Sequence, residues 1–224
     1  MRGLCAAIVL VTVCASAGGA QRRVYTTEPN VWVSGGAGGF TAEQVNDGNS
    51  GSTWNFGNSA NWQWAAGVEK NIGSGSSLGI GATYAHAPFA YISFAQPNTS
   101  GATCPINCDA HMDLTTLVGT FHFGAGIGFH QTVQFDGGIV NYANLKRDSD
   151  GVRLAGGNNT DPFFTIGYGL GYGFNEKTQL EFIPVWGIAI HERSGLSNGV
   201  SNTNSIRSLR VALRMGFGGR TYRR

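Results

Sequence analysis

Large and small residues alternate along the segment from Pro162 to Phe174, PFFTIGYGLGYGF. The even positions from Phe164 onward are aromatic or aliphatic, whereas the odd positions hold one threonine and then four glycines. A period of two predicts a β-strand. A half-buried strand of a soluble protein pairs an apolar face with a polar face. Here the second face has almost no side chains, so an ordinary soluble sheet does not explain the pattern.

Comparable alternation recurs along the chain, in segments separated by stretches rich in Gly, Asn, Ser and Asp. The eight predicted strands are Val31–Thr41, Asn61–Lys70, Leu78–Ile92, Met112–Phe123, Phe129–Ala143, Pro162–Phe174, Thr178–Ile190 and Ile206–Phe217. The gaps after the second, fourth and sixth strands are short, and the other gaps are long and polar. Short turns alternating with long outer loops are typical of a meander across an outer membrane, and an even strand count lets the sheet close. The sequence therefore predicts an all-β fold, an eight-stranded antiparallel up-and-down transmembrane β-barrel.

The hairpins around the short turns indicate which face of each strand is inside. Turn symmetry sets Glu69 opposite Gly79 in the first hairpin and Gly171 opposite Glu181 in the third. One face of each hairpin is then small or polar, and the other is bulky and apolar. Because side chains fill the interior of an eight-stranded barrel, we predict that the glycines and polar residues face inward and the bulky residues face lipid. A soluble, secreted lipocalin-like ligand binder with the faces reversed is an alternative.

The last predicted strand carries two arginines on its small face, in SLRVALRMGF. An arginine facing lipid near the bilayer midplane costs about 2 to 4 kcal/mol. Inside the barrel, Arg210 and Arg214 could instead meet Glu181 on the adjacent strand and Glu69 further round. We therefore predict an ionic network of these four residues in the barrel interior, with Glu181 close to Arg214.

Composition and the N-terminal segment indicate export. Only 12% of the 224 residues are charged, 35 are glycine, and the net charge is +2. Arg2, the apolar run from Leu4 to Val13 and the small residues that follow predict a secretory signal peptide over residues 1–20, cleaved after Ala20 or after Ala17. Residues 21–224 would then form one outer-membrane barrel domain.

Removal of the signal peptide leaves two cysteines, Cys104 and Cys108, in the motif CPINC. Export to an oxidising compartment favours a disulfide that closes a small loop. The spacing is poor for zinc, and no other pattern in the sequence predicts a metal or a cofactor. His122 and His130 flank the second short turn and would face each other if that turn were centred on Gly126, but one pair of histidines is a weak metal signal.

The whole predicted mature chain resembles the small outer-membrane β-barrel proteins of Gram-negative envelopes, such as the transmembrane domain of OmpA and the OmpX-type barrels. The resemblance rests on the signal peptide, the eight alternating segments and the final strand LRVALRMGF. It implies assembly by the outer-membrane insertion machinery, which uses a terminal aromatic residue. Here Phe217 is followed by GGRTYRR, either a basic periplasmic tail or a continuation of the strand toward Tyr222.

The segment IHERSGLSNG, around His191, resembles the motif region of the lipid A deacylases, whose sequence is His, any residue, Ser and then Asn-Ala-Gly-Leu. A serine nucleophile needs a histidine base and an acid that orients it. Here Arg193 occupies the nucleophile position, Ser194 follows one residue late, and Asn204 and Ser205 stand where an acid is needed. The spacing therefore favours a polar strand end over a catalytic centre.

These features predict a non-enzymatic integral protein of the Gram-negative cell outer membrane. Its role would be structural in the envelope or would use the long outer loops, with Trp54 and Phe56 exposed for surface interaction. The strands are porin-like, but eight of them leave no open water channel. The expected partners are outer-membrane lipid, lipopolysaccharide and the insertion machinery, without nucleic acid, for a monomer. The alternatives are a lipid A acyl hydrolase that uses His191 and Ser194 and the soluble lipocalin-like binder.

Overall fold

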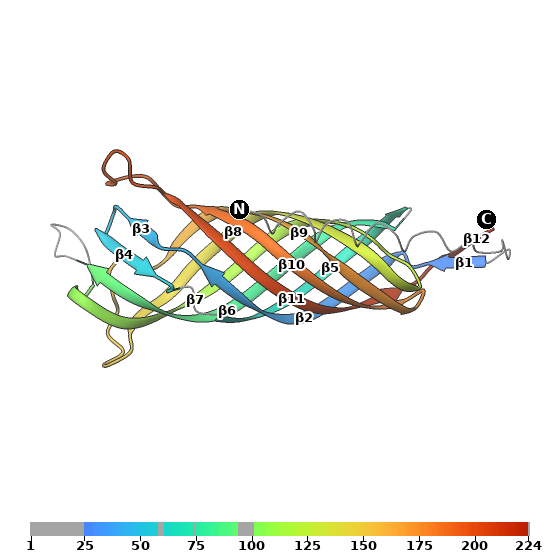
Figure 1. Ribbon diagram of the computed structural model, residues 1–224, viewed down its shortest axis with the longest axis horizontal. Helices are drawn as coiled ribbons and strands as arrows, with labels where there is room; N and C mark the ends of the chain where they lie inside the picture. The colour runs from blue at the N-terminus through green and yellow to red at the C-terminus, as the bar shows by residue number, and fades with distance from the viewer. Residues whose placement is uncertain (1–24, 58–60, 74, 94–100, 224) are drawn as a thin grey trace, which may run out of the picture.

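The computed structural model describes residues 25–57, 61–73, 75–93 and 101–223 (Figure 1). Eight long strands form the barrel: β2 (Val31–Ala42), β5 (Asn61–Gly73), β6 (Ser76–Ser93), β7 (Cys104–Phe123), β8 (Gly128–Arg147), β9 (Asn159–Asn175), β10 (Thr178–Ile190) and β11 (Thr203–Phe217). Four short strands accompany them: β1 (Tyr25–Glu28), β3 (Val45–Asp47), β4 (Ser52–Asn55) and β12 (Arg220–Arg223). The predicted signal peptide, residues 1–20, lies outside the described residues.

The eight long strands form one closed antiparallel barrel. Each long strand pairs with its neighbour in the chain, and the last long strand, β11, pairs with the first, β2. This closure leaves no long edge strand unpaired. The predicted fold class is confirmed. Among the described residues no helix is long and apolar enough to span a membrane.

The two hairpins used to assign the faces have the predicted register, with Glu69 opposite Gly79 and Gly171 opposite Glu181. The second hairpin differs. His122 pairs with Gln134 and not with His130, a displacement of four residues. The first five residues of β8 pair only with β9 and extend beyond the end of β7, so the connection is not the symmetric turn that the sequence suggested.

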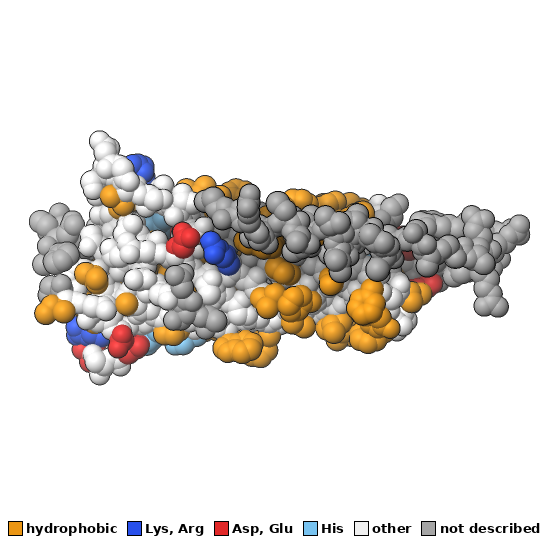
Figure 2. All heavy atoms as spheres, in the orientation of Figure 1, with side chains coloured by type: hydrophobic (Ala, Val, Ile, Leu, Met, Phe, Trp, Pro, Cys, Tyr) orange, Lys and Arg blue, Asp and Glu red, His pale blue; other side chains and the backbone are white. Residues whose placement is uncertain are grey.

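The two faces of the barrel wall differ as predicted. On β9 the glycines from Gly167 to Gly173 are buried, while Tyr168, Leu170 and Phe174 are exposed. The outward apolar residues form a belt, which includes Trp62, Trp64, Val68, Leu78, Ile80, Leu117, Phe135, Ile166, Tyr168, Leu170, Phe182, Trp186, Leu209, Val211, Leu213 and Phe217. On the face drawn in Figure 2, hydrophobic side chains gather over the middle of the barrel and toward its short-turn end. An exposed belt of this kind is suited to hydrocarbon and not to water.

Strands β6 to β8 extend well beyond this belt on the side of the long loops. β7 and β8 each have 20 residues, against 12 and 15 in the predicted strands. A 20-residue strand tilted by about 40° rises about 50 Å, roughly twice the ~25 Å height of a membrane-spanning apolar band. The outer half of the barrel therefore extends beyond the height of such an apolar band.

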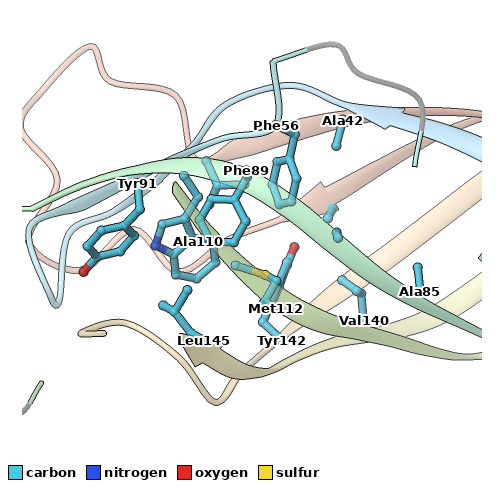
Figure 3. Packing of buried hydrophobic residues seen from close by; sticks show 14 of the residues in the cluster. Ala42, Phe56, Ala85, Phe89, Tyr91, Ala110, Met112, Val140, Tyr142 and Leu145 are labelled. Carbon is cyan, nitrogen blue, oxygen red and sulfur yellow. The ribbon is translucent and has the colours of Figure 1, made fainter. Parts of the chain in front are cut away.

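A hydrophobic core fills this outer half, as in a soluble protein (Figure 3). Its large members are Phe40, Trp54, Phe56, Phe89, Tyr91, Met112, Tyr142, Leu145, Leu154 and Phe163. The expectation that Trp54 and Phe56 are exposed is wrong, since they are 0% and 2% exposed. Strand β4 pairs with β6 and continues the barrel wall, which turns the Trp54 ring toward the interior. Phe56 follows β4 directly, and its ring packs on Phe89 with a centroid distance of 5.2 Å. The spacing of two residues between Trp54 and Phe56 is the sequence signal that could have placed them there.

The two ends of the described chain form a separate two-stranded sheet, β1 with β12. It projects from the short-turn end of the barrel (Figure 1). Strand β11 ends at Phe217, and the next two residues, Gly218 and Gly219, have φ of +67° and +142°. Such backbone angles favour glycine and end the strand. The residues after Phe217 therefore form neither a free tail nor a continuation of β11.

Candidate functional site

The inner part of the barrel lumen is occupied by an ionic cluster around Arg214. The Arg214 guanidinium donates hydrogen bonds to Glu69 Oε2 at 2.6 Å and to Glu181 Oε1 at 3.2 Å. Ser77 bonds to Glu69, and His122 Nε2 lies 3.1 Å from Glu181 Oε1. All of these side chains are buried. Because each charge has an opposite partner, the cluster closes the lumen without leaving an isolated buried ion.

Arg214 comes from β11, Glu181 from β10 and Glu69 from β5, so the cluster crosses the lumen. The ring of Trp32 lies 4.7 Å from the Arg214 guanidinium carbon, a cation–π contact. The sequence placed Arg214 beside Glu181 and Glu69 because all three lie on the small faces of their strands. The sequence pattern did not place Ser77 and His122 in this cluster. Both come from strands whose stagger relative to β10 and β11 cannot be read from the sequence.

Arg210 belongs to a second polar layer and not to the Arg214 cluster. Its guanidinium bonds to the side-chain oxygen of Gln134. Gln134 donates to Asp136 at 2.7 Å, and Thr165 donates to the same carboxylate at 2.8 Å. Arg210 is thus linked to the Asp136 carboxylate through the side-chain amide of Gln134. Among the described residues, no hydrogen bond or ion pair joins Arg210 directly to Glu69 or Glu181. The cause of this arrangement is the shifted register of β8, which brings Gln134 and Asp136 to the level of Arg210 in the barrel.

The lumen holds small cavities between its layers of side chains. One cavity of about 60 Å³ lies between the Arg210 layer and the outer core, lined in part by Gln63, Asp136, Phe163 and Thr165. A second of about 30 Å³ lies between the Arg210 and Arg214 layers. A cavity of this size holds a few water molecules at most.

At the outer end of the barrel, above the apolar belt, His191 lies between two carboxylates. Its Nδ1 is 2.7 Å from Asp161 Oδ2, and its Nε2 is 3.6 Å from Asp47 Oδ1. The three side chains come from the end of β10, the start of β9 and the β3–β4 hairpin, and each is 4% exposed or less. We call Asp47, Asp161 and His191 the outer node.

Aromatic and hydroxyl groups enclose the outer node. The rings of Trp54 and Tyr142 lie edge-on to His191, with centroids 5.2 and 6.0 Å from its ring. Ser50 donates to Asp47 Oδ2 at 2.5 Å. Gly156, from the loop between β8 and β9, approaches so closely that an added Cβ would lie 2.7 Å from Asp47 Oδ2. The node therefore links three outer connections to the barrel wall: the β3–β4 hairpin, the loop between β8 and β9, and the start of the loop after β10.

The two carboxylates keep His191 protonated. Burial by itself lowers the pKa of His191, but the hydrogen bonds and negative charges of Asp161 and Asp47 outweigh burial and raise the pKa to about 9. Burial also opposes the charge on Asp47, yet the contacts with His191 and Ser50 hold the pKa of Asp47 below its ordinary value. The node is thus a buried imidazolium between two carboxylates at neutral pH.

The same geometry separates His191 from Ser194. The Ser194 hydroxyl is exposed and donates to Glu192 Oε1 at 2.7 Å, while both ring nitrogens of His191 face buried carboxylates. A general base must lie within hydrogen-bond reach of its nucleophile. Asn204 is buried and Ser205 is on the opposite face of β11. These residues are therefore not arranged as the catalytic group that the deacylase-like motif would require.

Of the remaining sequence-predicted residues, the two cysteines and His130 lie apart from both clusters. A disulfide joins Cys104 to Cys108 at the outer end of β7. His122 belongs to the Arg214 cluster, whereas His130 Nδ1 lies 3.1 Å from the Gly128 carbonyl oxygen, so the two histidines do not face each other. Within the described ranges, no group of three or more His, Cys, Asp or Glu side chains is arranged to hold a metal ion.

The solved structures that resemble this barrel include outer-membrane proteins. Neisserial surface protein A has a TM-score of 0.53 and 10% identity, over 84% of this chain and 97% of its own. The barrel has the fold of the small outer-membrane proteins. The N-terminal barrel domain of Pseudomonas aeruginosa OprF (15% identity, TM-score 0.41) and Ail of Yersinia pestis (8%, 0.42) also match, each over 84% of this chain and 99% of its own.

No protein-family model and no curated protein sequence matches the barrel. At these identities the structural likeness shows the fold alone. Function must therefore be argued from the residues of this chain.

Proposed function

We propose that the protein is a non-enzymatic integral barrel of the Gram-negative outer membrane that presents a rigid platform above the bilayer for envelope or surface interactions. The observation that carries this proposal is the filling of the lumen by successive layers of side chains, with cavities of about 60 and 30 Å³ between them. The Arg214 cluster, the Arg210 layer, the hydrophobic core and the outer node follow one another from the inner to the outer end. A filled lumen argues against transport through the barrel.

The outer half supports a role in surface interaction. Its loops are anchored by buried side chains: the β3–β4 hairpin through Trp54 and Asp47, and the loop after β8 through Leu154 and Ala155. The loop that begins after β10 is held by Asn202 Nδ2, which donates to the His191 carbonyl oxygen at 2.7 Å. A surface that is ordered before binding loses less conformational entropy when a partner binds.

The apolar belt supports outer-membrane lipid and lipopolysaccharide as the surroundings of a monomeric barrel. Its aromatic and aliphatic side chains face outward on all eight long strands except β2, whose outward positions are mainly small. Phe217 is the last residue of β11 and is exposed, as expected of an aromatic residue read by the insertion machinery.

Fractionation and conductance together test this proposal. The full chain, expressed in a Gram-negative host, should fractionate with the outer membrane and show heat-modifiable gel mobility. In planar bilayers it should give no sustained conductance. Recovery as a soluble periplasmic protein would support the lipocalin-like alternative and refute the membrane location, and stable ion channels would refute the filled lumen.

Lipid A mass spectrometry tests the non-enzymatic part. Cells that express the barrel should have the same lipid A acylation as cells without it. Loss of an acyl chain that depends on Ser194, and not on a control serine such as Ser149 in another outer loop, would establish the acyl hydrolase instead. Loss of activity in a His191 variant alone would not establish an acyl hydrolase, because His191 also holds the outer node together.

A further inference from the structure

Two histidines lie side by side on the outside of the barrel wall, just above the apolar belt. His86 is on β6, two residues beyond the outward-facing Tyr84, and His111 is on the neighbouring strand β7. Their ring centroids are 4.7 Å apart. The side chain of His86 is 57% exposed and that of His111 is 26% exposed. Both rings are therefore accessible from the aqueous side of the membrane boundary.

Each ring is oriented by a carboxylate. His86 Nδ1 lies 2.9 Å from Asp113 Oδ1, and His111 Nδ1 lies 2.5 Å from Asp148 Oδ1. Asp113 is itself positioned, since it accepts hydrogen bonds from Tyr84 at 3.0 Å and from Asn144 at 2.6 Å. A carboxylate that accepts the Nδ1 proton fixes the neutral tautomer with a lone pair on Nε2, which is the second-shell arrangement of many metal-binding histidines.

The spacing of the rings matches ligation of one ion. Zinc–nitrogen bonds are about 2 Å long, so two imidazoles on one tetrahedral ion have centroids about 5 Å apart. Neither Nε2 takes part in a hydrogen bond with another described residue, and both side chains are at least partly exposed. Both nitrogens are therefore available to an external ligand, and the rings that carry them lie side by side on neighbouring strands.

We propose that His86 and His111 bind one divalent transition-metal ion that prefers imidazole, such as Zn²⁺ or Cu²⁺. The part of the chain that the structure describes offers no third protein ligand. Water therefore completes the coordination sphere. Asp113 and Asp148 act as positioning residues. Lys146, the cross-strand partner of His111, adds a positive charge nearby that weakens binding. This inference does not depend on what the outer loops recognise.

Calorimetric titration with Zn²⁺ tests the site, on the full barrel in detergent, without a polyhistidine tag and after treatment with a chelator. One ion should bind per barrel, and His86→Ala or His111→Ala should each weaken binding at least tenfold. Asp113→Asn and Asp148→Asn should weaken it less, and Lys146→Ala should strengthen it. His130→Ala, a change inside the lumen, is the matched control and should leave binding unchanged.

Electron paramagnetic resonance of bound Cu²⁺ gives an independent readout. Two nitrogen ligands are expected in the natural sequence and one in either single histidine variant. Heat-modifiable gel mobility shows that each variant is folded. The site is refuted if folded protein binds no Zn²⁺ or Cu²⁺, or if binding survives unchanged in both His86→Ala and His111→Ala.

Discussion

Replacement of His191 by glutamine tests whether the outer node holds the outer half of the barrel together. The substitution removes the positive charge between Asp47 and Asp161, while the amide keeps hydrogen-bonding capacity. Removing one partner from a buried ion pair costs about 3 to 5 kcal/mol, because the remaining charge is left uncompensated. We expect His191→Gln to lower the free energy of unfolding by roughly this amount at pH 6.5.

The pKa of His191 predicts how that stabilisation depends on pH. A rise from 6.5 to about 9 corresponds to about 3 kcal/mol, at about 1.4 kcal/mol for each pH unit. Because the pKa is raised on folding, this contribution is fully present below pH 6.5 and is lost as the pH rises through about 9. Asp47 has a lowered pKa, so its contribution is present above pH 3.8 and is lost on acidification below that value.

Urea unfolding in detergent, followed by tryptophan fluorescence at pH 6.5 and 9.5, measures this effect. The difference in stability between the natural sequence and His191→Gln should shrink by about 3 kcal/mol between the two pH values. His86→Gln, a change at an exposed histidine, should retain the natural pH dependence. If the difference between the natural sequence and His191→Gln is the same at both pH values, His191 does not carry the charge assigned to it.

Three further substitutions test the lumen, the belt and the loops. Arg214→Met should destabilise the barrel by about 3 to 5 kcal/mol in urea, against less than about 0.5 kcal/mol for the exposed Arg207→Met; equal effects would contradict the buried ionic cluster. Leu170→Arg on the belt should lower the free energy of unfolding in lipid vesicles by about 2 to 4 kcal/mol. Thr160→Arg, further toward the outer end on the same face of β9, should lower it by at most about 1 kcal/mol. A larger effect of Thr160→Arg than of Leu170→Arg would contradict the proposed position of the membrane. Gly156→Val should make the outer loops sensitive to a protease concentration that leaves the control variant Gly151→Val intact. Gly151 and Gly156 both have positive φ, but only Gly156 lies close to Asp47. Equal resistance would show that the loop does not depend on the node.

The alternation of residue types along the chain was enough to predict the eight long strands and which face of each strand is inside. The alternation in β9 needs no tertiary information, because successive side chains of a strand point to opposite sides. The same local rule placed Arg210 and Arg214 inside, next to strands that carry Glu181 and Glu69. A strand that alternates large apolar residues with glycines fits a barrel wall whose interior is crowded and whose exterior is apolar.

The stagger of the strands and the contents of the outer half, in contrast, depend on packing between segments that are far apart in the chain. The offset of β8 against β7 depends on the closure of the whole barrel, and it separated His122 from His130 and gave Arg210 its partner Gln134. The outer node joins positions 47, 161 and 191, which meet because loops fold over a shared core. Such contacts follow from packing between distant segments, and a period of two residues contains no information about them.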